Sequence, residues 1–464
     1  MVKNGRLIKS ILAVGILSFL GIVIETALNI AFPQLMIDFN MSARTIQWLT
    51  TGYMLVSTII IPFGSHLQKR FKTISLFRMA VSCFLLGTIL AGISVNFSLL
   101  LIGRLLQGVA AGIGLPLMFT IILEQSPKEQ VGMYMGLGTL VIAFAPAVGP
   151  VYGGIVLKLF QWKTLFLLII PVIILTWILG EHSISQTSKT QKIPFDFQGG
   201  LLLIVFLMSA LFLLLGFTSG NNIYVQLILT LITIVTGLFF IFVEKHRQHA
   251  VLKVGLFKNW LFNIFLLAFF LLQLMSLSMS FLIPNVLQTA FEQTTATAGL
   301  LVLPAAIIDA LVSAFAGIIY DKVNQKLPII FGVAIILLTF IIANFLNPST
   351  ANMAFIYISF MFGLGLSYSN IMTFCLSNIT TDLKNDGNVI FMTAQSYSGA
   401  IGTALTASLL TLAQTGFKNK KLAALAGLKL NYNMLAFLSL IVLVCILVCF
   451  IFTKSKSKAS QNLF

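Results

Sequence analysis

Two carboxyl groups stand inside long apolar stretches of the sequence, where each is a candidate for chemistry. Glu25 lies in the first stretch, and Asn29 follows it by one helical turn on the same face. A carboxylate is costly in hydrocarbon unless it faces a cavity, finds a partner or is protonated. A proton-carrying group needs this behaviour, so we predict that Glu25 carries protons and that the Asn29 amide orients it. The alternative interpretation is a structural hydrogen bond to a neighbouring helix.

Asp309 is the second acid within an apolar stretch, and it lies near the middle of that stretch. A charged Asp at a helix centre costs roughly 2.5–3.5 kcal/mol on insertion scales. No basic residue lies within one turn of it. We therefore predict that Asp309 is protonated or pairs with a cation that the substrate brings. The alternative is a neutral acid that caps a helix break near Pro304.

Arg104 is the cation that we single out within an apolar stretch. Gln107 shares its helical face, and Gly108 and Gly112 form a small-residue surface that lets another helix approach closely. We predict that Arg104 pairs transiently with a titrating acid, or with a backbone carbonyl when that acid is neutral. The alternative is that Arg104 extends its side chain to the membrane interface, because it is close to the end of its stretch.

Residues 145–154 read Ala-Pro-Ala-Val-Gly-Pro-Val-Tyr-Gly-Gly. Such a segment bends a helix and allows another backbone to touch it, so we predict that it closes one end of a transport path. The residues expected to pack there are Pro146, Gly149, Pro150, Gly153 and Gly154.

Two short charged segments follow apolar stretches at corresponding places. Lys69 and Arg70 follow the apolar stretch at 46–64, and Asp321 and Lys322 follow the stretch at 298–320. One interpretation is charge that only sets membrane topology. The other is a cytoplasmic latch between helices, and the sequence leaves both open.

Other chemistry finds little support. The four cysteines form no CxxC pair, and the sequence has no GxxxxGK[ST] phosphate-binding loop. All four histidines fall in or near predicted loops, so we expect no histidine proton relay. We expect no metal, no cofactor and no enzymatic activity. The histidines are His66, His182, His246 and His249.

The composition explains where these residues must lie. Of 464 residues, 58% are hydrophobic and 9% are charged, against roughly 25% charged in soluble domains. The mean hydropathy is +1.03. These values exclude a soluble enzyme, and we expect no nucleic-acid partner although the net charge is +16, because excess Lys and Arg in a membrane protein belong to loops. The sequence predicts an all-α polytopic membrane protein.

A helix needs about 20 apolar residues to cross the hydrocarbon. This length predicts fourteen spans, at 11–32, 46–64, 74–95, 99–123, 133–157, 164–179, 200–217, 224–243, 261–283, 298–320, 327–346, 354–376, 389–412 and 435–452. With a cytoplasmic N-terminus, 20 Lys and Arg lie inside and 7 outside, so both termini are predicted to be cytoplasmic.

An internal repeat is visible in three landmarks. Pro33 and Pro284 are 251 residues apart, Gly64 and Gly317 are 253 apart, and Gly108 and Gly363 are 255 apart. Transporters are often built from such repeats. The near-constant offset predicts an N-terminal six-helix bundle at 1–181, a two-helix insertion at 182–258 and a C-terminal six-helix bundle at 259–464.

Taken together, these motifs resemble the major facilitator superfamily, and specifically its fourteen-span drug:proton antiporters of the EmrB/QacA type. Residues 25–33 resemble the first-span motif, 104–108 the fourth-span motif associated with proton coupling, and 145–154 the fifth-span motif that accompanies export. The chain departs from the family at Gln68, where the loop motif usually has an acid, and Asp309 matches no general family feature.

The resemblance implies a proton-coupled efflux antiporter that exports lipophilic, cationic drugs by alternating access from the plasma membrane of a bacterium. We expect small molecules, protons and the lipid bilayer as its partners, and a monomer. The first alternative is a specialised exporter of one endogenous metabolite, lipid, peptide or antibiotic. The second is a proton-coupled nutrient importer, and the third is a membrane sensor.

Overall fold

The computed structural model describes residues 4–186, 190–191, 196–218, 223–245, 253–293, 295–414, 417 and 419–461, and none of these residues lies in a strand. Inside a bilayer the backbone must satisfy its own hydrogen bonds, so apolar segments of this length fold as helices. The elements in chain order are α1 (Asn4–Asp38), α2 (Ala43–Ile46), α3 (Trp48–Ile60), η1 (Ile61–Phe63), α4 (Gly64–Arg70), α5 (Thr73–Gly92), α6 (Phe97–Gln125), η2 (Lys128–Gln130), α7 (Val131–Ala143), α8 (Ala145–Leu159), α9 (Thr164–Leu167), α10 (Ile170–Ser183), α11 (Phe197–Thr218), α12 (Ile223–Lys245), η3 (Val254–Lys258), α13 (Trp260–Phe291), α14 (Thr295–Lys322), α15 (Leu327–Phe345), α16 (Thr350–Ser377), η4 (Thr381–Leu383), α17 (Lys384–Gln414) and α18 (Lys420–Gln461).

Eleven helical segments in the described part of the chain are long and apolar enough to cross a membrane. The fourteen crossings expected from the sequence are therefore not confirmed. The other three expected crossings fall on α7 with α8, on α11 and on α17. The first of these is interrupted at Phe144, and α8 begins at the next residue, Ala145, with Pro146 in its first turn, where a proline is tolerated.

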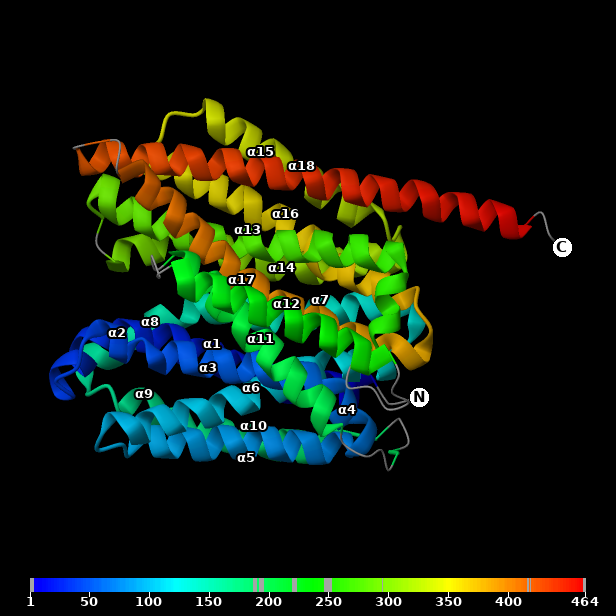
Figure 1. Cartoon of the computed structure of the whole chain (residues 1–464), viewed down its shortest axis with the longest axis horizontal. Coiled ribbons are helices and arrows are strands. Elements are labelled where there is room, and N and C mark those ends of the chain that lie inside the picture. The colour runs from blue at the N-terminus through cyan, green and yellow to red at the C-terminus, as the bar shows by residue number, and fades with distance from the viewer. Residues whose placement is uncertain are drawn as a thin grey trace.

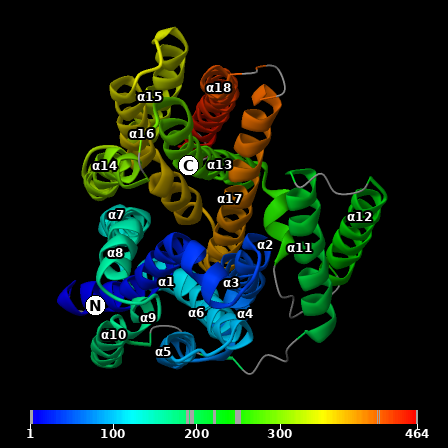
Figure 2. The ribbon, with the colours of Figure 1, turned by 90° about the vertical axis from the view of Figure 1, so that its left-hand side faces the viewer.

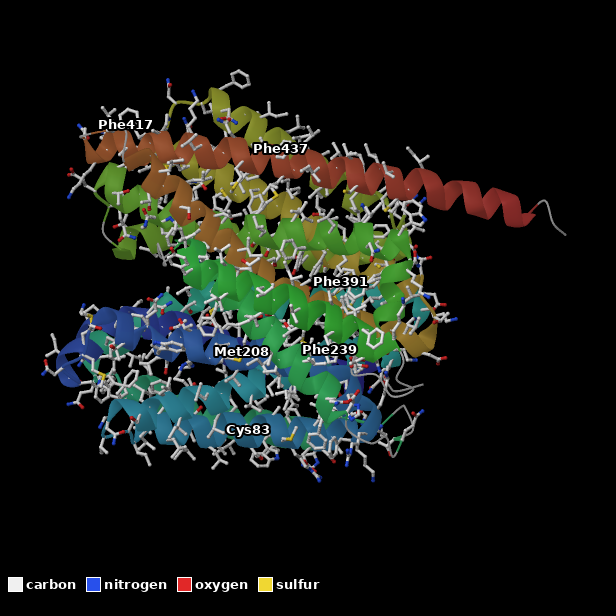
Figure 3. The ribbon with its side chains drawn as sticks, in the orientation of Figure 1. Cys83, Met208, Phe239, Phe391, Phe417 and Phe437 are labelled. Atoms are coloured by element: carbon white, nitrogen blue, oxygen red, sulfur yellow. The ribbon has the colours of Figure 1, made fainter. Side chains whose placement is uncertain are left out.

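The helices group into two bundles, with α11 and α12 standing beside them (Figure 2). One bundle is built from α1 to α10 and the other from α13 to α18. Helix α11 packs on α12, on α17 and on α3, while α7 of the first bundle lies along α14 of the second. Large apolar side chains point outward from both α12 and α18, whereas Phe391 of α17 is fully buried (Figure 3).

Helix α1 begins and α18 ends at the same end of the molecule (Figure 1). We call this the latch end, and it carries the connections 71–72, 126–130 and 378–383. The opposite, far end carries the connections 39–42, 93–96 and 160–163. The first predicted span ended at residue 32, but α1 continues through Pro33 to Asp38. A proline is tolerated in a membrane helix because neighbouring groups satisfy the freed backbone.

Candidate functional site

Arg104 of α6 is completely buried inside the first bundle. Its Nε donates to the Leu49 carbonyl oxygen at 3.1 Å, and its Nη1 donates to Gln107 Oε1 at 2.7 Å. Gln107 Nε2 in turn donates to Thr88 Oγ1 at 2.9 Å. These contacts tie α6 to α3 and α5, so the interpretation that Arg104 reaches the membrane interface is wrong.

One donor of Arg104 is left over. Its Nη2 is buried and has no hydrogen-bond partner among the described residues. A buried donor without an acceptor costs free energy, and the cost is greater for a charged group. The free energy of the molecule would therefore fall if Arg104 Nη2 gained an acceptor in another conformation.

Tyr53 of α3 lies beside this guanidinium. The Arg104 Cζ atom is 4.3 Å from the centroid of the Tyr53 ring, which is the geometry of a cation–π contact. The Tyr53 hydroxyl reaches α1 at Gly21, where a Cβ atom would come within 2.8 Å of the hydroxyl oxygen. The absence of a side chain at Gly21 therefore leaves space for the Tyr53 hydroxyl.

Glu25 follows Gly21 by one turn of α1 and is half-buried. It interacts electrostatically with both Tyr53 and Arg104. Within the described part of the chain, no ion pair shorter than 4.0 Å reaches it. The structure thus brings Glu25 and Arg104 into one electrostatic cluster without pairing them directly.

Asn29 has a different partner from the one that its spacing suggests. Its Oδ1 accepts a hydrogen bond from Thr50 Oγ1 of α3 at 3.1 Å. The amide therefore joins α1 to α3 one turn away from Glu25. We expected it to orient the carboxylate, and the structure gives it this inter-helix contact instead.

The glycines of α8 pack against α1 at the turn that carries Glu25. A Cβ atom on Gly149 would collide with Thr26 Oγ1 and come within 2.8 Å of the Val23 carbonyl oxygen. A Cβ atom on Gly153 would come within 3.0 Å of the Ala27 Cα atom. These two positions need glycine because the helix backbones touch there.

The expected packing does not extend to the whole segment. A Cβ atom on Gly154 would meet nothing within 4 Å, so the inclusion of Gly154 in the packing surface is wrong. Gly154 points away from α1 because it is one residue, or about 100°, further around the helix than Gly153. Pro146 is exposed at the start of α8, and the Pro150 side chain lies outside the described residues.

Gly108 and Gly112 bring α6 onto α3. Cβ atoms there would come within 2.6 Å of the Tyr53 carbonyl oxygen and the Ile60 Cβ atom. The helix that supplies Arg104 and the helix that supplies Tyr53 are thus held in backbone contact. This packing fixes the distance between the guanidinium and the ring.

Asp309 of α14 lies in the second bundle, against α16. A Cβ atom on Gly365 would come within 3.1 Å of Asp309 Oδ1. The carboxyl group is hydrogen-bonded to Ser313, one turn further along α14. It also interacts electrostatically with Tyr357 and Tyr368 of α16. The carboxyl is thus held between two helices beside aromatic hydroxyls, and not at a helix break near Pro304, since α14 runs unbroken from Thr295 to Lys322.

The two bundles are joined at the latch end by Asp386 of α17, which is completely buried. Lys69 Nζ pairs with Asp386 Oδ2 at 2.8 Å, and Ser65 donates to Asp386 Oδ1 at 2.6 Å. Asn388 Nδ2 also donates to the Pro116 carbonyl oxygen at 2.9 Å. Of the expected latch residues, Lys69 therefore does join helices across the bundles.

Asp321 makes a second contact between the bundles. Its two carboxylate oxygens accept hydrogen bonds from the backbone nitrogens of Gly132 at 2.9 Å and Met133 at 2.7 Å. It therefore caps the first turn of α7, where a negative charge is favourable. Arg70 lies 5.8 Å from the Phe71 ring centroid, and Lys322 is exposed.

Sequence reasoning missed Asp386, Asn388 and the role of Tyr53. Two features of the sequence could have pointed to Asp386. It is an acid in the first turn of a helix at 384–414, and the basic segment at Lys69 and Arg70 has Gln68 where an acid is usual.

The histidines were also misplaced. His66 is buried in α4 and His182 lies in α10, both within candidate spans, whereas His246 and His249 lie outside the described residues.

No metal centre is formed within the described part of the chain, where no three His, Cys, Asp or Glu side chains gather suitably. The arrangement instead offers membrane-embedded charged groups between packed helices. Such groups mark substrate and ion pathways in membrane proteins.

Comparison with known proteins identifies the family. Residues 14–403 match the model of the Major Facilitator Superfamily, and the chain belongs to that family. It is a membrane transporter and not an enzyme. The solved structure of the human organic anion transporter MFSD10 (TETRAN) has the same fold, with a TM-score of 0.67 at 12% identity, covering 96% of this chain and 100% of that one.

Bacterial relatives cover most of the chain. An uncharacterized MFS-type transporter of Bacillus subtilis, YhcA, is 34% identical over 88% of this chain and 77% of its own length. The lincomycin resistance protein LmrB of Listeria innocua is 31% identical over 86% of this chain and 85% of its own. The multidrug export protein EmrB of Haemophilus influenzae is 27% identical over 87% and 81%.

Proposed function

We propose that this transporter exports lipophilic, cationic drugs or toxic compounds in exchange for protons. The observation that carries the proposal is the buried Arg104, which keeps one donor without a partner while Glu25 lies within its electrostatic reach. The names of LmrB and EmrB support the direction and class of transport. We further propose fourteen crossings, grouped as 1–181, 182–258 and 259–464, in a monomer.

In the proposed cycle, Glu25 takes up a proton from the far end. Rocking of the two bundles then separates Lys69 from Asp386 and opens the latch end, as expected for alternating access. Glu25 releases its proton there, and Arg104 Nη2 stabilises the carboxylate. The negative charge attracts a cationic substrate, and closure of the latch exposes the substrate to the far end.

This cycle assigns the latch end to the cytoplasm of a bacterium. In the described part of the chain, basic residues gather at this end in or beside the connections, as the positive-inside rule requires of cytoplasmic loops; they include Lys69, Arg70, Lys72, Lys128, Lys322, Lys326 and Lys384. One elementary charge moved through 100 mV supplies about 2.3 kcal/mol, which is enough to bias the exchange. The sequence has no phosphate-binding loop, so the proton gradient is the energy source that we propose.

Everted vesicles test the exchange directly. We would energise them, add ethidium, and follow the collapse of the pH gradient for the wild type, for Glu25→Gln and for Glu129→Gln. Glu129 is an exposed acid in η2 at the latch end, so it controls for the loss of one charge. We expect collapse with the wild type and Glu129→Gln only. A wild-type response from Glu25→Gln would refute the assignment of Glu25.

A further inference from the structure

The far end of the second bundle carries an unusual concentration of lysines. Lys420 and Lys421 begin α18, and Lys429 follows two turns later, and all three are exposed. The sequence adds Lys418, and no Asp or Glu follows Asp386. The positive-inside rule gathers Lys and Arg at the cytoplasmic end, which we assign to the opposite side of the membrane. Membrane topology therefore gives no reason for these lysines.

Lys429 borders an open groove between α17 and α18. At Gly427 the two helices are in contact, since a Cβ atom there would come within 2.8 Å of Leu410 Cδ2. Beside this crossing lies a groove of about 390 Å³ with Lys429 and Asn433 on its polar edge. Its apolar lining includes Leu412, Phe417 and Leu430, and the exposed Phe417 ring lies at the far end of the molecule (Figure 3).

An exposed apolar stripe leads away from the groove along α18. It runs toward the latch end with helical spacing, through Leu430, Phe437, Leu440 and Val444. At 1.5 Å per residue, the 11 residues from Lys429 to Leu440 rise about 16 Å. This is close to half of a hydrocarbon core about 30 Å thick. A ligand with its head at Lys429 and a tail along this stripe would therefore span one leaflet.

We propose that this groove binds an anionic phospholipid of the far-end leaflet. Its phosphate pairs with Lys429 and accepts a hydrogen bond from the Asn433 amide, and an acyl chain lies on Leu430 and Phe437. Charge complementarity selects an anionic headgroup, because the polar edge and its surroundings carry lysines and no acid follows Asp386 in the sequence. The proposal rests on the membrane orientation proposed above, but not on the substrate or on the exchange of protons.

Native mass spectrometry of the full chain tests the selection. The protein, purified in a mild detergent, is mixed with equimolar phosphatidylglycerol and phosphatidylcholine, whose acyl chains are alike except that one set is deuterated. The variant is Lys429→Gln. The matched control is Lys158→Gln, which removes an exposed lysine at the far end of α8 in the other bundle.

We expect the wild type and Lys158→Gln to retain phosphatidylglycerol over phosphatidylcholine. Lys429→Gln should reduce that preference by about fivefold, the effect of one lysine on an anionic lipid surface. Equal retention of the two lipids by the wild type, or equal preference in the two variants, would overturn the proposal. So would a dimer that loses phosphatidylglycerol as it forms and dissociates in Lys429→Gln, because the groove would then hold a second copy of the chain.

Discussion

The guanidinium of Arg104 lies against the ring of Tyr53, 4.3 Å from its centroid, and the hydroxyl of the same tyrosine reaches the helix that carries Glu25. Tyr53 thus contacts Arg104 with the face of its ring, while its hydroxyl lies at Gly21, one turn of α1 before Glu25. Glu25 interacts electrostatically with both side chains, and among the described residues it forms no ion pair shorter than 4.0 Å. A transporter that moves a proton on Glu25 needs such a separation, because a permanent ion pair would hold the carboxylate ionised.

We predict that Tyr53→Phe and Tyr53→Leu differ. The phenylalanine ring keeps the cation–π contact, which is worth about 2 kcal/mol when it is shielded from water. Leucine loses the contact and leaves the buried guanidinium without its aromatic partner. We expect Tyr53→Phe to transport within about threefold of the wild type, and Tyr53→Leu to lose most drug-dependent proton movement in everted vesicles. Equal activity of the two variants would show that the ring does not position Arg104.

We predict that Arg104→Lys is not tolerated. Lysine keeps the charge but cannot donate to the Leu49 carbonyl and to Gln107 from one planar group. The loss of one such charge-assisted hydrogen bond costs about 1.5–3 kcal/mol, so transport should fall by at least tenfold. Efflux of a fluorescent cation from loaded cells measures this.

Arg78→Lys is the control for Arg104→Lys. Arg78 makes an ion pair with Glu181 between α5 and α10, and its side chain is 53% exposed. Exposed pairs contribute little, so this variant should remain within about twofold of the wild type. A similar loss in both variants would mean that the burial of Arg104 has no special part in transport.

Sequence reasoning predicted an all-helical membrane fold, because long apolar stretches are a strong signal. It could not place the contacts between stretches. The acid that meets Lys69 is Asp386, which is 317 residues away in the sequence. Asn29 and Glu25 share a helix face, yet Asn29 bonds to Thr50 because α3 crosses α1 at that turn. Partners across helices depend on packing angles that the sequence pattern alone does not reveal.

We predict that a methyl group at Gly149 disrupts the contact of α8 with α1, whereas one at Gly154 does not. In Gly149→Ala the new Cβ atom would collide with Thr26 Oγ1. Overpacking of this kind costs about 1–3 kcal/mol, so the melting temperature should fall by several degrees. In Gly154→Ala the Cβ atom meets open space, and its melting temperature should match that of the wild type.

The Gly149→Ala/Thr26→Ala double variant tests the cause. Removal of the Thr26 hydroxyl relieves the worst of the overlap, although the Val23 carbonyl oxygen remains 2.8 Å from the new Cβ atom. We expect partial recovery of the melting temperature, measured in detergent with a thiol-reactive or tryptophan fluorescence signal. If Gly154→Ala lowers the melting temperature as much as Gly149→Ala does, the packing of α8 on α1 is not the cause of the destabilisation in Gly149→Ala.

The Lys69–Asp386 pair should behave as a coupled unit. Asp386 is completely buried, so Lys69→Asp would place two carboxylates together, and Asp386→Lys would bury a cation beside Lys69. Breaking a buried pair costs about 3–5 kcal/mol, and we expect the lower value because the Lys69 side chain is 25% exposed. Each single reversal should destabilise the latch-end contact and lower the melting temperature. The double reversal restores opposite charges, so it should recover a large part of the lost melting temperature. If the losses of the two single variants simply add in the double variant, the two residues do not interact.

Asp309 should discriminate between substrates by charge. In Asp309→Asn the amide can still bond to Ser313, so the packing of α14 on α16 at Gly365 is kept while the negative charge is lost. If a cationic substrate pairs with this carboxylate, its transport should fall by at least tenfold, whereas a neutral lipophilic substrate of similar size should be transported nearly unchanged. Parallel efflux assays with the two substrates, in the wild type and the variant, give this ratio. An equal loss for both would instead assign Asp309 to proton movement, and no loss for either would leave Glu25 as the single acid on which exchange depends.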